Sequence, residues 1–92
     1  MIVVQLGDKT YKLKKLTMRG LLRLTAVFRG TEVDEEKLAE VALKLLREHL
    51  VEPKLTPEQI DELGLEGLVL FNKLLEGSGL TEEKLRELEL FR

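Results

Sequence analysis

A single histidine, two acidic clusters and one glycine-rich turn are the features of this chain that could support chemistry. His49 is the only histidine and there is no cysteine. Neither a thiolate metal site nor an HExxH motif can therefore be assembled. We interpret His49 as a partly buried residue near the negative end of a helix rather than as a lone ligand or base.

The acidic clusters at 34–36 and 61–62 could in principle bind a divalent ion or share a proton. We interpret both as surface charges; those at 34–36 belong to a predicted helix start, where carboxylates complement the positive end of the helix dipole. Gly77-Ser78-Gly79 has the glycines of a phosphate loop, but it follows a helix and lacks the Lys-Thr/Ser that should come next. We expect a turn between helices there. The sequence thus predicts no catalytic residue, no metal or cofactor site and no enzyme.

Charge is divided unevenly along the chain. Residues 1–30 carry seven basic residues against Asp8 alone, a net charge of +6, and residues 31–92 carry a net charge of −8. Such a division can hold two halves of a protein together or join one subunit to the next. The basic residues that could form a phosphate-contacting surface are Lys12, Lys14, Lys15, Arg19 and Arg23. Aromatic residues are not interleaved with them and the pI is about 5.5, which favours a solvated or subunit-facing surface over nucleic-acid binding.

The composition predicts one small globular domain spanning residues 1–92. Hydrophobic residues make up 43% of the chain and charged residues 35%, and 22 leucines favour helices. We expect a cytoplasmic protein, because no secretory leader is visible and no apolar run approaches the roughly 20 residues of a membrane span. The abundance of Glu, Lys, Arg and Leu is typical of thermophile proteins and of designed helical proteins alike.

The first elements predicted are two antiparallel strands. Residues 2–14 read as a β-hairpin with Gly7-Asp8 as a two-residue type II′ loop. In that register Val4 lies opposite Tyr11 and Ile2 lies opposite Leu13. Their side chains then share one apolar face, which must dock on helices because an isolated hairpin is marginal in water.

Helices are predicted for the rest of the chain, so the fold class is mainly α (α+β), with the hairpin packed on a bundle of four to five helices. Leu45 lies in the middle of the apolar stripe of the longest helix, and Thr56 with Gln59 has the spacing of a capping box. The predicted helices cover residues 18–29, 35–50, 57–63, 65–76 and 82–91. In the first of them, the residues expected to face the core are Met18, Leu21, Leu22, Thr25 and Phe28, with Leu24 and Val27 widening the stripe.

Two segments resemble one known family. The first runs Asp8-Lys9-Thr10-Tyr11-Lys12-Leu13-Lys14-Lys15-Leu16-Thr17 and leads into a helix. The second is the restart Glu52-Pro53-Lys54-Leu55-Thr56-Pro57-Glu58-Gln59-Ile60, followed by a helix that closes at Gly77-Ser78-Gly79-Leu80. In this order and spacing they resemble the tail assembly chaperones of long-tailed bacteriophages and related prophages.

That resemblance implies a small, mostly helical, non-enzymatic protein of the host cell cytoplasm. It would bind the long helical tape-measure protein, keep it soluble while the tail tube assembles, and in some forms contact the tube protein. A leucine-rich domain of this size is suited to binding helices, and the charge division suits head-to-tail self-association. The residues expected to contact partners are Lys14, Lys15, Arg19, Arg23, Leu85, Leu88 and Phe91.

Two other interpretations remain open from the sequence. A small DNA-binding or antitoxin-like regulator would use the basic first third, and a cytoplasmic adaptor or designed helical domain would have another partner or none. A tape-measure reading frame immediately downstream of the gene would decide for the chaperone.

Overall fold

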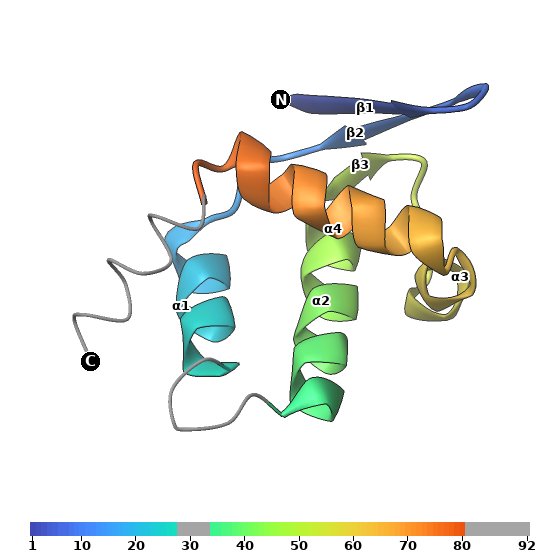
Figure 1. Cartoon of the computed structure of the whole chain (residues 1–92). Helices are drawn as coiled ribbons and strands as arrows, with labels where there is room; N and C mark the ends of the chain where they lie inside the picture. The colour runs from blue at the N-terminus through green and yellow to red at the C-terminus, as the bar shows by residue number, and fades with distance from the viewer. Residues whose placement is uncertain (28–33, 81–92) are drawn as a thin grey trace.

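A computed structural model describes residues 1–27 and 34–80 of the chain. Three strands form one antiparallel sheet in the order β1-β2-β3, and four helices lie on one side of it (Figure 1). The fold is therefore α+β, as the sequence predicts. The elements are β1 (Ile2–Leu6), β2 (Lys9–Leu13), α1 (Met18–Val27), α2 (Glu35–His49), β3 (Leu50–Glu52), α3 (Pro57–Glu62) and α4 (Leu65–Gly77). The helix predicted for residues 82–91 lies outside the described residues.

The predicted hairpin and its register are confirmed. Ile2 pairs with Leu13, Val4 with Tyr11 and Leu6 with Lys9. Gly7 has φ 65°, which the first central position of a type II′ loop requires and which glycine adopts without strain. Val4, Tyr11 and Leu13 are buried beneath the sheet, so the apolar face of the hairpin covers the helices as expected.

A third strand follows α2 directly. The prediction of helix through Leu50 is wrong, because Leu50 has the extended angles φ −74° and ψ 117° and begins β3. Lys12 pairs with Glu52 and Leu13 with Leu50, with a register irregularity between them. One more backbone hydrogen bond, from Lys14 N to His49 O at 2.8 Å, continues the contact beyond the strand. The end of α2 is thereby fixed to the central strand of the sheet.

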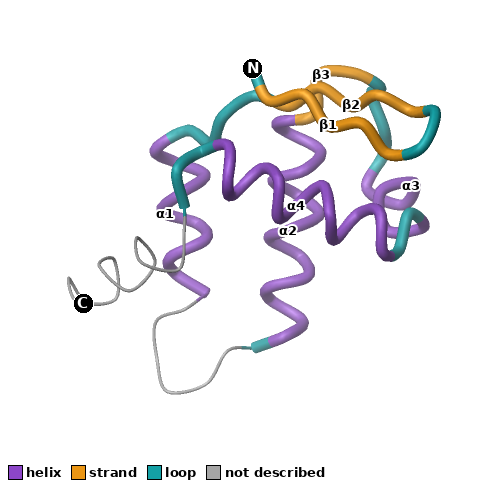
Figure 2. The backbone as a smooth tube through the Cα atoms, turned by 45° about the horizontal axis from the view of Figure 1, so that its top comes forward, coloured by secondary structure: helices purple, strands orange, loops and turns teal. Residues whose placement is uncertain are grey.

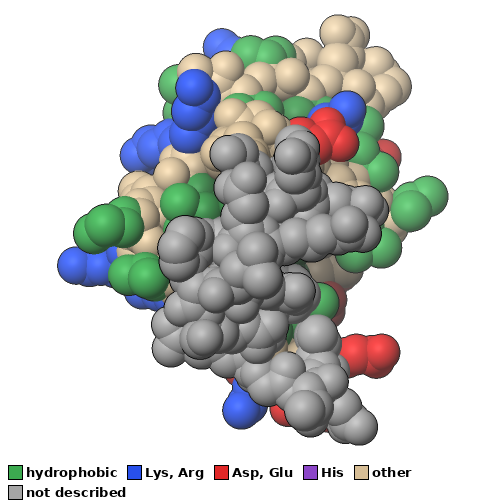
Figure 3. All heavy atoms as spheres, turned by 60° about the vertical axis from the view of Figure 1, so that its left-hand side comes forward, with side chains coloured by type: hydrophobic (Ala, Val, Ile, Leu, Met, Phe, Trp, Pro, Cys, Tyr) green, Lys and Arg blue, Asp and Glu red, His purple; other side chains and the backbone are tan. Residues whose placement is uncertain are grey.

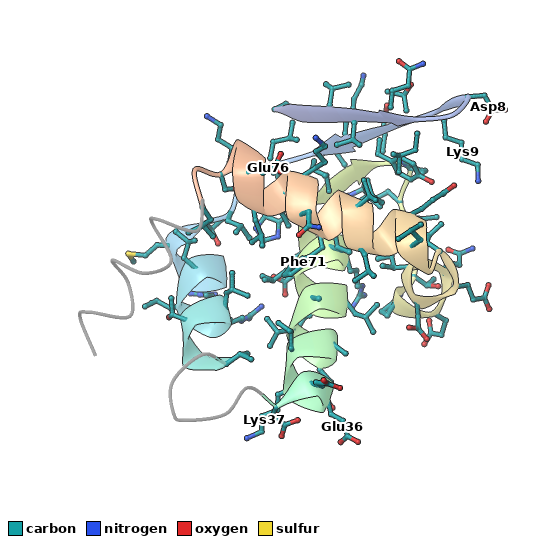
Figure 4. All side chains as sticks on the ribbon, in the orientation of Figure 1. Asp8, Lys9, Glu36, Lys37, Phe71 and Glu76 are labelled. Atoms are coloured by element: carbon teal, nitrogen blue, oxygen red, sulfur yellow. The ribbon has the colours of Figure 1, made fainter. Side chains whose placement is uncertain are left out.

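The predicted bundle of four to five helices is not confirmed; residues 1–27 and 34–80 contain four helices, which lie on one side of the sheet. In Figures 1 and 2, α4 runs beneath the sheet and across the direction of α1 and α2, and α3 is a short turn at one end. Phe71 projects from the side of α4 that faces the other helices (Figure 4). The core lies between the helices and the sheet. Its most buried large side chains are Tyr11, Leu13, Leu24, Leu45, Leu70 and Leu74.

The orientation of α1 differs from the prediction. Leu24 and Val27, expected only to widen the stripe, are buried together with Gly20, whereas Met18 and Leu22 face solvent. A Cβ atom built on Gly20 would lie 3.2 Å from Cδ2 of Leu45, so α1 approaches α2 closely at this glycine. Close contact at Gly20 sets the rotation of α1 and turns the Met18–Leu22 row outward. Phe28 lies outside the described residues.

Helix ends follow the local chemistry of the sequence. The capping box at α3 is confirmed, with Gln59 N donating to Thr56 Oγ1 at 3.2 Å and Thr56 N donating to Gln59 Oε1 at 2.9 Å. At the end of α4, Leu80 N donates to Leu75 O and Gly79 N to Glu76 O, the pair of hydrogen bonds that defines a Schellman motif. The predicted turn at 77–79 is therefore a helix C-cap. Within residues 1–27 and 34–80, no helix combines the length and the apolar character needed to cross a membrane.

Leu45 is a central residue of the core, because its side chain is fully buried and lies against α1 at Gly20. Leu45→Ala should lower the free energy of unfolding by about 2–4 kcal/mol through lost transfer energy and the cavity left behind. Leu22→Ala, at a side chain 56% exposed, is the matched control and should change it by less than about 0.5 kcal/mol. Urea unfolding followed by circular dichroism measures both, and equal effects would contradict the assigned core.

Candidate partner-binding surface

The segment between β2 and α1 is held by its backbone while its lysines reach solvent. Lys14 N donates to His49 O at 2.8 Å, and Leu16 N donates to Ser78 Oγ at 2.9 Å. These bonds attach the segment to the end of α2 and to the C-cap of α4. Lys14 and Lys15 are exposed, so two positive charges are displayed from a fixed backbone.

The solvent-facing side of α1 adds apolar area next to these charges. Met18 and Leu22 are 76% and 56% exposed and lie one helical turn apart on the same side of α1. Arg19 is exposed next to Met18. We name the set of five residues Lys14, Lys15, Met18, Arg19 and Leu22 the α1 surface. Figure 3 views the molecule with the side of α1 turned forward, and Lys and Arg side chains lie beside hydrophobic ones along the left border of that face.

Arg23, the fourth basic residue predicted to contact a partner, is bound within the protein. Its Nη1 donates to both carboxylate oxygens of Glu48, at 2.8 and 3.0 Å, and so links α1 to α2. The hydrogen bond from Arg23 lowers the pKa of the Glu48 carboxyl below its ordinary value. No ion pair joins Lys14, Lys15 or Arg19 to a carboxylate within the described residues. All three are exposed, and none of them is neutralised by an acidic side chain of residues 1–27 and 34–80.

The remaining predicted contact residues, Leu85, Leu88 and Phe91, lie outside the described residues. The exposure of Met18 and Leu22 was missed from the sequence, because two apolar rows compete on α1 and only packing decides between them. Gly20 was the available signal, since a glycine within a helix permits close approach on its own side. The link from Ser78 to Leu16 joins residues 62 positions apart and leaves no local pattern in the sequence.

His49 and Asp34, two of the groups that could have carried chemistry, have structural partners. His49 is buried, and its Nδ1 lies 2.7 Å from Leu45 O, a carbonyl that can only accept, so Nδ1–H is the donor. The Asp34 carboxylate caps α2 by accepting from Glu36 N and Lys37 N. In the described part of the chain, no three side chains among His, Cys, Asp and Glu are grouped so that they could hold a metal ion.

Comparison with protein families, with curated proteins and with solved structures found no match to this chain.

The ion pair between Arg23 and Glu48 gives a pH-dependent prediction. A double-mutant cycle with Arg23→Ala and Glu48→Ala should give a coupling free energy below about 1 kcal/mol at pH 7, since both side chains are more than one-third exposed. The folded-state pKa of Glu48 is depressed, so the coupling is present above the unfolded pKa and is lost as pH falls through the folded one. Unfolding curves at pH 7 and at acidic pH test this, and a coupling that grows on acidification would be inconsistent with the assigned pair.

Proposed function

We propose that this protein is a non-enzymatic binding module whose α1 surface holds an amphipathic helix of a partner, and that it serves as a tail assembly chaperone for a phage tape-measure protein. One observation carries the proposal: Met18 and Leu22 are exposed one turn apart, on a helix whose start carries the exposed cations Lys14, Lys15 and Arg19. Apolar side chains at this spacing suit a helix laid along them. The cations suit acidic residues at the border of that helix.

The sequence resemblance supplies the identity of the partner. A tape-measure protein is long and helical and exposes apolar faces until the tail tube encloses it, so a chaperone needs an apolar strip that is too small to bind it permanently. Two exposed side chains provide such a strip, because a small contact area favours weak and reversible binding. The same proposal includes a contact with the tail tube protein. It also includes head-to-tail association of copies, in which the basic first third of one chain meets the acidic remainder of the next.

Removing the apolar strip should abolish the chaperone effect. In co-expression with a long coiled-coil fragment of a tape-measure protein, the wild-type chain should keep the fragment soluble, and Met18→Ser with Leu22→Ser should not. Both side chains face solvent, so the double variant should retain its stability within about 1 kcal/mol. The control is Leu65→Ser with Leu68→Ser, which removes two exposed leucines from α4 instead. An equal loss in both double variants would contradict a role specific to the α1 surface.

Reversing the charges tests the electrostatic part of the proposal. Lys14→Glu, Lys15→Glu and Arg19→Glu should weaken both fragment binding and the salt-sensitive part of self-association, since exposed charges act over only about 8–10 Å at physiological ionic strength. The fold should remain, because all three residues are exposed and a glutamate in the first turn of α1 complements the helix dipole.

The matched control reverses Lys37, Lys44 and Lys54, which are exposed residues outside the α1 surface, and so makes the same change in net charge. Lys37 lies at the end of α2 farthest from the sheet (Figure 4). Light scattering measures the assembly state of each variant, and circular dichroism measures whether its fold is retained. A wild-type chain that binds DNA, and loses this only in the Lys14, Lys15 and Arg19 variant, would favour the regulator instead.

A further inference from the structure

The two outer strands of the sheet differ in how their free edges are protected. β3 is only three residues long, and Pro53 follows it directly. Its last residue, Glu52, is charged and lies 3.7 Å from the Lys12 ammonium. Short length, charge and proline are the features by which natural proteins prevent a sheet edge from pairing with another chain.

β1 has none of these protections. It is five residues long, with the sequence Ile-Val-Val-Gln-Leu, and contains no charge and no proline. Val3 is 61% exposed, and Gln5 is also exposed on the outer face of the sheet. Figures 1 and 2 show α4 beneath the sheet and no described strand continuing the sheet beyond β1. A long, uncharged edge of this type is a template for another strand.

The register shows which backbone groups this edge offers. In a hairpin with a two-residue loop, the pair next to the loop is hydrogen-bonded and alternate pairs follow, so Leu6, Val4 and Ile2 bond to β2. The hydrogen bonds on the other side of β2 fit the same alternation, because Lys14 N donates to His49 O there. The N–H and C=O groups of Val3 and Gln5 consequently point away from the sheet. Within residues 1–27 and 34–80, no other backbone hydrogen bond involves them.

We infer that the free edge of β1 pairs antiparallel with β1 of a second copy of this chain, with Val4 at the twofold axis. Val3 then lies opposite Gln5 of the second copy, and Gln5 opposite its Val3. Each of these pairs can exchange both N–H···O bonds, which joins the two sheets into one. The surface is separate from the α1 surface, so this inference stands independently of the proposed function.

The side chains favour a second copy as the occupant. Ile2 meets Leu6 of the other chain and Val4 meets its counterpart, so the apolar face of one β1 continues that of the other. No like charges oppose each other. The nearest charges on the outer face, Lys12 and Lys12 of the second copy, are about three strand spacings or roughly 14 Å apart, beyond the screening length of about 8 Å.

The same geometry sets the strength and the size of the assembly. One five-residue strand buries less area than a standard permanent interface, so we expect a weak dimer in concentration-dependent equilibrium with the monomer. A twofold contact uses the same edge on both copies and therefore stops at two.

Sedimentation equilibrium of the full chain in about 0.5 M sodium chloride, where the screening length is about 4 Å, isolates this contact from charge-driven association. The wild type should show a monomer–dimer equilibrium. Val3→Lys should weaken it about tenfold or more, because a lysine replaces an apolar side chain at the strand contact and is a feature by which natural sheet edges avoid pairing. Thr10→Lys is the matched control, since it adds the same charge to the same face of the central strand, and it should leave the equilibrium within about twofold.

Val3→Pro provides a second variant, because it removes an N–H that is unpaired in the monomer and should abolish the dimer while circular dichroism stays unchanged. Hydrogen exchange gives the direct readout: the Val3 and Gln5 amides should exchange more slowly as protein concentration rises. A monomer at all concentrations, a dimer unaffected by Val3→Lys and Val3→Pro, or growth beyond the dimer in high salt would each overturn the inference.

Discussion

The antiparallel pairing of β2 with the three residues after α2 is the contact on which the arrangement of the chain depends. It joins residues 12–13 to residues 50–52 and converts a hairpin, marginal on its own, into a three-stranded sheet. The bond from Lys14 N to His49 O continues this contact at the point where the chain leaves the sheet for α1. Because α1 begins four residues later, this pairing fixes where the helix starts relative to the sheet and to the end of α2.

The elements that could be predicted are those whose structure depends on residues close together in the sequence. The hairpin register follows from the alternation of apolar residues about Gly7-Asp8, because a shift of one residue would expose Val4 and Tyr11. The start of α3 follows from the reciprocal bonds of Thr56 and Gln59. Leu45 could be assigned to the core because the apolar residues of α2 recur on one side only.

The features that could not be predicted depend on contacts between segments far apart in the sequence. β3 is too short to show an alternating pattern, and it exists because β2 offers a partner. The rotation of α1 was open because Met18–Leu22 and Leu24–Val27 are both apolar, and the close contact at Gly20 selected the second pair. For the candidate site, the basic residues could be named from sequence. Their apolar neighbours could not, and neither could the engagement of Arg23 by Glu48, since both depend on how α1 lies against α2.

Tyr11 gives this protein an unusual spectroscopic property. It is the only tyrosine and there is no tryptophan, so the near-ultraviolet absorbance and fluorescence of the folded protein arise chiefly from one side chain. That side chain is buried on β2, and its hydroxyl lies 3.4 Å from a carboxylate oxygen of Glu66 at the start of α4. Burial, followed by the Glu66 charge, raises the pKa of the Tyr11 hydroxyl. Emission from this chain is consequently a local probe of the junction between the sheet and α4, and alkaline titration of its absorbance reports on the same junction.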